Sequence, residues 1–280
     1  MDLKQRLKTH LSQIVRDRDP YLATGGHFFV RQYIREQLGQ WGEVEPHEFQ
    51  VSGRTFVNLI LNLPATSRRN HLPPILIGAH YDAVPGSPGA DDNATGVVAM
   101  LELARKFAAT PARYPLRLVA FDMEEYGLLG SAAYAEKLKQ QKQPLRLMMS
   151  LEMLGYCDST PNSQRYPAPL DKIYPNRGDF IALVGNLRTI PDLIHLSRNI
   201  RKVGVPSEWL PVPNKGLIVR QTRLSDHSPF WDAGYAAMMI TDTAFLRNPH
   251  YHQPSDNIAS LDLDFLTGVC RGLEVGIQRL

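Results

Sequence analysis

The chain has 280 residues, a mass of 31.5 kDa and a formal net charge of +3, a length that suits one large domain or two small ones. Apolar residues make up 43 % and charged residues 21 % of the chain, and no apolar run approaches the roughly 20 residues that span a bilayer. These values exclude disordered, collagen-like, coiled-coil and integral membrane proteins, and the weak charge without dense basic tracts gives no indication of a nucleic-acid partner.

Helical stripes and short β-rich runs alternate along the whole chain. In chain order, we predict helices over 2–18 and 26–40, strands over 56–63 and 74–79, a helix over 95–109, a strand over 115–121, a helix over 128–140, strands over 146–152 and 179–184, a helix over 188–203, a strand over 236–241 and a helix over 261–278. Several strand runs are almost continuously apolar, which indicates burial on both faces. The alternation predicts an α/β fold with a mostly parallel sheet between two helical layers.

Residues 156–178 do not fit this alternation. The segment contains four prolines among Asn, Ser and Tyr residues, which predicts one long ordered loop. Long loops inside compact domains often carry function. We interpret this one either as a wall of a substrate pocket or as a surface excursion.

The cysteines and the N-terminal segment bear on the cellular setting. Cys157 and Cys270 are too few for a disulfide framework, although a single pair between them stays open. The first residues carry leucines at helical spacing and several acids, and no apolar stretch typical of a signal peptide follows them. We therefore expect a cytoplasmic protein, unless a signal was removed before Met1.

Acidic and histidine residues follow four of the predicted strands. In order, the segments are His80-Tyr81-Asp82 with Asp91-Asp92-Asn93 beyond it, Asp122-Met123-Glu124-Glu125, Glu152, and Asp242 with His250-Tyr251-His252 beyond it. In open α/β sheets the functional residues gather outside the carboxyl ends of the strands. One acid there is commonly a helix cap, but so many carboxylates at one edge repel each other unless cations neutralise them. The pattern favours a metal site.

The residue types indicate which metal the site would bind and which roles its side chains could take in catalysis. Imidazole and carboxylate without thiolate suit zinc, with cobalt or manganese as substitutes. His80 and Asp82 share one face of an extended segment, so Asp82 can orient a metal-binding His80 by a hydrogen bond. Glu124 and Glu125 diverge, so one can bind metal while the other moves a proton during hydrolysis. Each motif alone also fits a solvated helix start or a cap.

Five segments in order resemble the M28 family of co-catalytic zinc aminopeptidases and carboxypeptidases. They span about residues 80–256 and comprise His80-Tyr81-Asp82, Gly89 to Gly96, Asp122 to Ser131, Ser225 to Phe230 and Tyr251 to Asp256. The resemblance implies a three-layer α/β/α sandwich around a mixed, mainly parallel sheet, of the zinc-peptidase and phosphorylase type. It implies a single peptidase domain over 1–280, without the apical or protease-associated insertion of larger relatives, and hence an open site for small peptide ends.

The resemblance also implies roles for the site residues. Two zinc ions share Asp91 as a bridging ligand, and the two ligand sets are completed by His80 with Glu152 and by Glu125 with His252. Glu124 is the general base, and Asp82 supports His80. The peptide bond between Asp91 and Asp92 is expected to be cis.

This sequence departs from the family pattern at two places. Glu152 stands where many relatives have aspartate, which leaves its coordination mode open. Some relatives stabilise the oxyanion with a tyrosine just before the Ser-Asp-His segment, and this chain has Gln221-Thr222-Arg223 there. His227 and Tyr251 are substitutes for that substrate-binding role, and His227 has the alternative of a hydrogen bond at a helix start.

The activity implied by the resemblance is hydrolysis of a terminal peptide bond by a hydroxide shared between two metals, with an aminopeptidase as the first hypothesis. A carboxypeptidase is the nearest alternative, since Lys215, Arg220 and Arg223 could bind a substrate carboxylate. A glutaminyl-cyclase-like transferase with one zinc and a metal-free binding protein are further alternatives. We expect small peptides as partners and neither nucleic acid nor membrane; side-chain preference and oligomeric state stay open.

Overall fold

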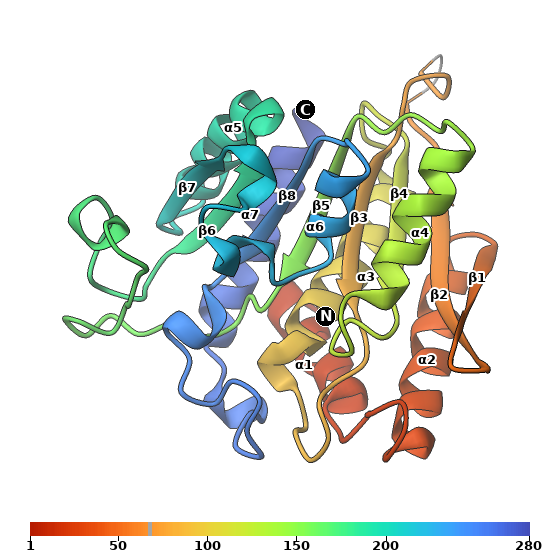
Figure 1. Cartoon of the computed structure of the whole chain (residues 1–280), viewed down its shortest axis with the longest axis horizontal. Coiled ribbons are helices and arrows are strands. Elements are labelled where there is room, and N and C mark those ends of the chain that lie inside the picture. Colours follow the sequence, from red (N-terminus) through yellow and green to blue (C-terminus); the bar gives the residue numbers. More distant parts are fainter. Residues whose placement is uncertain (67–68) are drawn as a thin grey trace.

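The computed structural model describes residues 1–66 and 69–280. An eight-stranded sheet with the order β1-β2-β4-β3-β5-β8-β6-β7 runs through its centre (Figure 1). The strands are β1 (Val44–Val51), β2 (Arg54–Leu63), β3 (Ile75–His80), β4 (Leu116–Phe121), β5 (Leu147–Glu152), β6 (Ile181–Asn186), β7 (Ser207–Val212) and β8 (Ala237–Thr241).

The sheet is mixed, with a parallel centre. β3 pairs in parallel with β4 and β5, β5 with β8, and β6 with β7, whereas the pairs β1–β2, β2–β4 and β6–β8 are antiparallel. Every residue of β3, β5 and β8 is buried. This burial on both faces explains why their sequences are apolar runs rather than alternating patterns.

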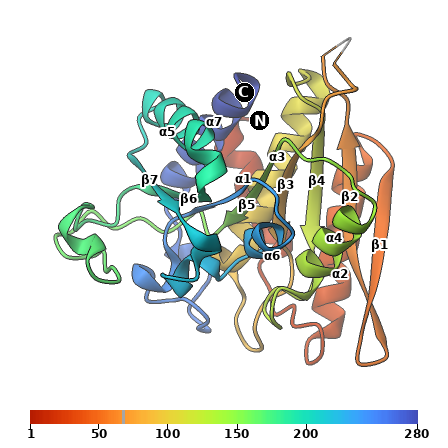
Figure 2. The ribbon, with the colours of Figure 1, turned by 45° about the horizontal axis from the view of Figure 1, so that its top comes forward.

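Helices cover both faces of the sheet (Figures 1 and 2). One layer contains α1 (Leu3–Ile14), α2 (Thr24–Gly39), α3 (Gly96–Ala109), α5 (Ile190–Lys202) and α7 (Leu263–Gln278). The opposite face carries α4 (Leu129–Gln140) and the short α6 (His227–Asp232), which lie in front of the sheet in Figure 1. Each layer packs on its own apolar core. The predicted α/β/α sandwich is thereby confirmed.

All the predicted helices and strands are present, and most begin and end within two residues of the expected positions. The predicted helix over 2–18 ends early, at Ile14, because Val15 adopts an extended conformation. Among the α-helices and strands of the described residues, β1, β7 and α6 were not predicted. The two strands lie at the sheet edges and contain Pro46 and Pro211, which interrupt the strand pattern, and α6 has only six residues.

Two expectations from composition can be compared with the structure. Cys157 and Cys270 are both free, so the alternative of a disulfide between them is wrong. Within residues 1–66 and 69–280, no helix has the length and apolar character that crossing a membrane requires.

A buried carboxylate ties α3 to α1. The side chain of Glu102 is 1 % exposed and accepts hydrogen bonds from Nε of Arg6 at 3.0 Å and Nε of Arg105 at 2.9 Å. Burial alone would raise the pKa of Glu102, but hydrogen bonds from His10, Arg105 and Arg6 outweigh it and lower the pKa to about 2. Because the unfolded pKa is about 4.3, these contacts stabilise the fold above that pH and are lost as the pH falls through about 2.

We predict that Glu102→Gln lowers the free energy of unfolding at pH 7 by about 2 kcal/mol, since charge-assisted hydrogen bonds are lost while exposure of Arg105 limits their strength. Urea unfolding at pH 7, 5 and 3.5 measures the difference from wild type, which should begin to shrink below about pH 4.3. The exposed Glu36 of α2 provides the control variant Glu36→Gln. A difference that stays constant across this range would contradict the assignment.

Candidate metal centre

The site lies beyond the carboxyl ends of three neighbouring strands. His80 ends β3 and Glu152 ends β5, while Glu124 and Glu125 follow β4 after a short turn. Asp92 comes from the segment Ala90–Thr95, which leads into α3, and His252 comes from the loop between β8 and α7. Parallel pairing of β3 with β4 and β5 brings these ends to one edge of the sheet.

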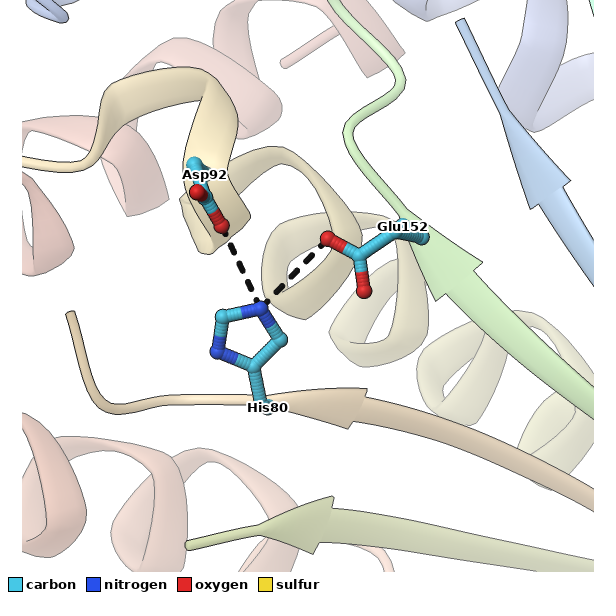
Figure 3. Close-up of side chains that lie close together, drawn as sticks. All are labelled: His80, Asp92 and Glu152. Atoms are coloured by element: carbon cyan, nitrogen blue, oxygen red, sulfur yellow. Dashed lines mark ion pairs between the residues drawn. The ribbon is translucent and has the colours of Figure 1, made fainter. Parts of the chain in front are cut away.

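The described side chains form three groups of closely spaced ligand atoms, two of which share Asp92; the third contains His80, Glu124 and Glu125. In the first group, Nε2 of His80 lies 3.3 Å from Oδ1 of Asp92 and 3.5 Å from Oε1 of Glu152 (Figure 3). In the second, Nε2 of His252 lies 3.1 Å from Oδ2 of Asp92 and 3.2 Å from Oε2 of Glu125. In each group the ligand atoms all lie within 4.8 Å of one another. Asp92 therefore offers one oxygen to each of the two groups that share it.

The hydrogen bonding of these atoms fits bound cations. Nε2 of His80, Oδ2 of Asp92, Oε1 of Glu125 and Nε2 of His252 are buried, and none has a hydrogen-bond partner in the described part of the chain. Buried polar atoms without partners are costly and rare. Here the atoms approach one another without the geometry of hydrogen bonds, as ligands around a common centre do. Imidazole and carboxylate donors without thiolate suit zinc.

The carboxyl groups of Glu124 and Glu125 resist ionisation in the absence of a cation. Burial raises the pKa of Glu125 to about 7, with a further contribution from the charge of Asp92. Burial also raises the pKa of Glu124 well above its ordinary value; the charge of His80 opposes this shift and that of Glu152 adds to it. A divalent cation beside these groups would favour their ionised forms.

Asp82 connects three site residues. Its Oδ1 lies 3.5 Å from Nδ1 of His80, and its two carboxylate oxygens accept the backbone N–H groups of Glu124 and Glu125, each at 3.1 Å. The two glutamates thus have a fixed backbone, so their side chains start from defined positions.

On the other side of the site, Oγ of Ser225 donates to Oε2 of Glu152 at 2.7 Å.

The structure corrects the expectation for Asp91. Its Oδ1 accepts the N–H of Gly155 at 2.9 Å and its Oδ2 accepts Nδ2 of Asn248 at 2.7 Å, so the carboxylate belongs to neither group. Asp92 occupies the shared position instead. The expected cis bond between Asp91 and Asp92 is also wrong, because the cis bond joins Asp92 to Asn93. Both errors are a shift of one residue within a run of two adjacent aspartates.

The two residues expected at the substrate have different surroundings. Tyr251 lines the pocket beside the two groups and stacks on His252, with ring centroids 3.7 Å apart. His227 is fully buried at the start of α6 and packs edge-on against Trp231, and its Nε2 lies 2.8 Å from the carbonyl oxygen of Thr222. Burial lowers the pKa of His227 to about 3. The structure therefore favours its alternative, the hydrogen bond at a helix start.

A pocket that is open to solvent adjoins the two groups. Its walls are mainly apolar and aromatic, and they include Tyr166, Pro167, Leu170 and Tyr174 of the loop 156–178. This finding agrees with the interpretation of that loop as a pocket wall. The charged side chains that line the pocket are all acidic: Asp92, Glu124, Glu125, Glu152 and Glu208.

Part of this pocket was missed by sequence analysis. Trp209 and Leu210 come from β7, and Phe245 and Leu246 from the short turn after β8. No motif marks these residues, because any large apolar side chain can build a wall. For the β7 residues, the available signal was the short strand pattern of 207–212, which Pro211 interrupts.

Comparison with known proteins agrees with this arrangement. The model of peptidase family M28 matches residues 58–272. The chain is 36 % identical over 260 residues to the uncharacterized protein YfbL of Escherichia coli (strain K12), covering 86 % of this chain and 77 % of YfbL. It is 30 % identical over 211 residues to aminopeptidase YwaD of Bacillus subtilis (strain 168), covering 74 % of this chain but only 41 % of YwaD.

Solved structures share the fold. The LapA aminopeptidase of Legionella pneumophila superposes with a TM-score of 0.73 at 18 % identity, covering 98 % of this chain and 72 % of that one. The glutaminyl cyclase of Bacteroides thetaiotaomicron gives a TM-score of 0.70 at 16 % identity, covering 99 % and 96 %. At such low identity these structures support the fold alone. The family match extends over most of the chain, and the chain belongs to peptidase family M28.

Proposed function

We propose that this M28 peptidase is a zinc-dependent aminopeptidase, which hydrolyses the first peptide bond of small peptides. One observation carries the proposal: two groups of ligand atoms share Asp92 beside an apolar pocket whose charged lining is entirely acidic. The first feature supports hydrolysis at a pair of ions, and the lack of basic side chains in the described lining supports a substrate that enters with its amino end.

The residues that would hold the ions follow from the two groups. His80, Asp92 and Glu152 would hold one ion, and Asp92, Glu125 and His252 would hold the other. Zinc suits these donors, with cobalt or manganese able to replace it. When bound, such ions polarise the scissile carbonyl and lower the pKa of the attacking water.

Glu124 is the residue that we assign to proton transfer. It lines the pocket beside His80 and Glu125, and its backbone N–H is held by Asp82. From this position its carboxylate accepts a proton from the attacking water and then delivers that proton to the departing amine nitrogen. Neither of the two groups that contain Asp92 requires Glu124 as a ligand, so its carboxylate stays available for this role.

The charges around the pocket favour the amino end of a peptide over the carboxyl end. Once Asp92, Glu125 and Glu152 hold the ions and Glu124 serves proton transfer, Glu208 is the acidic side chain of the lining that remains to attract a free α-ammonium group. No lysine or arginine among the described lining residues is placed to bind a terminal carboxylate. None of the basic residues considered as carboxylate ligands, Lys215, Arg220 and Arg223, is among the residues that line the pocket. Arg223 pairs with Asp232 at 2.6 Å, and Nζ of Lys215 donates to the carbonyl oxygen of Asp232 at 3.3 Å. These contacts weaken the carboxypeptidase alternative.

The position of Asp92 gives the first prediction for this site. Asp92→Asn should lower the zinc content of the purified protein toward zero, because one carboxylate serves both groups. Asp91→Asn should lower the melting temperature but retain zinc, because its contacts are hydrogen bonds to Gly155 and Asn248. Inductively coupled plasma mass spectrometry measures the zinc content of both variants, and thermal unfolding measures their melting temperatures. Equal loss of zinc in the two variants would contradict the assignment.

The role of Glu124 is tested by removing its charge. Glu124→Gln should retain about the wild-type zinc content while kcat falls by about 10³-fold, within the usual range for general acid–base catalysis. Glu136→Gln on the exposed face of α4 serves as the matched control and should match wild type in both measurements. Full activity of Glu124→Gln would remove this residue from the mechanism.

The direction of attack is tested with blocked peptides on the wild-type protein loaded with zinc. Peptides with a free amino end, an apolar first residue and an amidated carboxyl end should be hydrolysed, and N-acetylated peptides with a free carboxyl end should not. The reverse result would establish the carboxypeptidase alternative. Release of pyroglutamate from a peptide that begins with glutamine, by protein that holds one zinc, would instead favour a cyclase.

A further inference from the structure

One buried arginine is bonded entirely to main-chain oxygens behind the metal centre. Arg18, which lies between α1 and α2, is 0 % exposed. Its donors reach five backbone carbonyl groups: Nε that of Tyr81 at 2.8 Å, Nη1 those of Pro88 at 2.6 Å and Arg16 at 3.3 Å, and Nη2 those of Gly89 at 2.8 Å and Asp92 at 3.1 Å. The number of these acceptors equals the five N–H donors of a guanidinium group.

Four of these carbonyl groups belong to the chain between two ligand residues. The segment from His80 to Asp92 leaves the sheet, turns and returns to the centre, and Arg18 holds it at its beginning and at its end. Asp256 holds the same segment from another side, since its two carboxylate oxygens accept the N–H groups of Asp91 at 2.9 Å and Asp92 at 3.1 Å. The peptide groups on both sides of the Asp92 Cα are therefore fixed by charged side chains.

The cost of burying the charge of Arg18 is offset by carboxylates that lie near it without touching it. Burial lowers the pKa of Arg18, and the nearby charges of Asp92, Asp256 and Asp82 oppose that shift. None of these carboxylates forms a direct ion pair with Arg18. An arginine that served stability alone would gain more from a paired carboxylate. Its placement on carbonyl oxygens instead defines the path of the main chain.

We propose that Arg18 is a positioning residue for the metal centre: by holding the carbonyl groups of Gly89 and Asp92, it sets where the Asp92 carboxylate lies between the two groups. The inference rests on the proposed metal site. Lysine cannot replace Arg18, because a single ammonium has three donors on one atom and cannot reach five acceptors arranged around a plane. Arg18 itself touches neither the ions nor the substrate.

The experiment measures zinc affinity rather than activity. Arg18→Lys keeps the charge and Arg18→Met removes it, and both should raise the dissociation constant for zinc by about 10- to 100-fold, as loss of outer contacts to metal ligands typically does. Competition with a fluorescent zinc chelator gives the constant. Thermal unfolding of the zinc-free proteins separates this effect from a general loss of stability.

Arg146→Met is the control for the loss of a well-bonded arginine. Arg146 pairs with Asp192 through two contacts of 2.6 and 3.0 Å, at the end of β5 that lies about 20 Å from Glu152 along the strand. This variant should lower the melting temperature and leave zinc affinity unchanged. It shows what loss of a structural arginine does by itself.

A second variant disturbs the same contact with Arg18 in place. Gly89 has a φ of +59°, and a Cβ there would meet the carbonyl oxygen of Asp92 first and then the guanidinium nitrogens at 2.7 to 2.8 Å. Gly89→Ala should therefore weaken zinc binding by displacing the main chain of Asp92, which makes it a positive control for the effect of moving that segment. Arg18→Lys carries the test if Arg18→Met does not fold. Wild-type zinc affinity in the Arg18 variants, with only the melting temperature lowered, would overturn the inference. Failure of wild type to bind zinc would overturn the proposed function as well.

Discussion

Repulsion between buried carboxylates is the constraint on which the rest of the site depends. Asp82, Asp92, Glu124, Glu125 and Glu152 are gathered within one small volume at the end of the sheet. Like charges at such distances destabilise the fold strongly when water is excluded. In the proposed function, two divalent cations would remove this cost and make the cluster a catalytic centre, so the same interaction would link stability to function.

The parallel pairing at the centre of the sheet brings these side chains together. β3, β4 and β5 run in the same direction, so each ends at the same edge and delivers one part of the centre without a long loop. The remaining candidate ligands, Asp92 and His252, come from loops, and these need support from elsewhere. Arg18 and Asp256 supply it for Asp92 through its main chain.

Sequence patterns predicted most of the fold and most of the residues at the metal centre. The residues that they misplaced or missed have physical reasons. Long apolar runs identify the central strands because both faces are buried, and the residues directly after them, such as His80 and Glu152, follow from strand direction. The choice between Asp91 and Asp92 depends on main-chain torsion at one position, which composition does not encode. Arg18 bonds only to main-chain oxygens, and so leaves no complementary side chain to search for.

The antiparallel pair β8–β6 divides the sheet into a part that carries the candidate metal ligands and a part that carries the apolar pocket wall. The ligands arise from β3 to β5 and the adjoining loops, while much of the apolar wall comes from β6, β7 and the loop 156–178, on the far side of β8. Exchange of Ala182, Val184 or Trp209 therefore alters the shape that an incoming residue must match, and the ion-binding atoms keep their positions. Within this chain, the shape of the pocket wall can therefore change without a change at His80, Asp92, Glu125, Glu152 or His252.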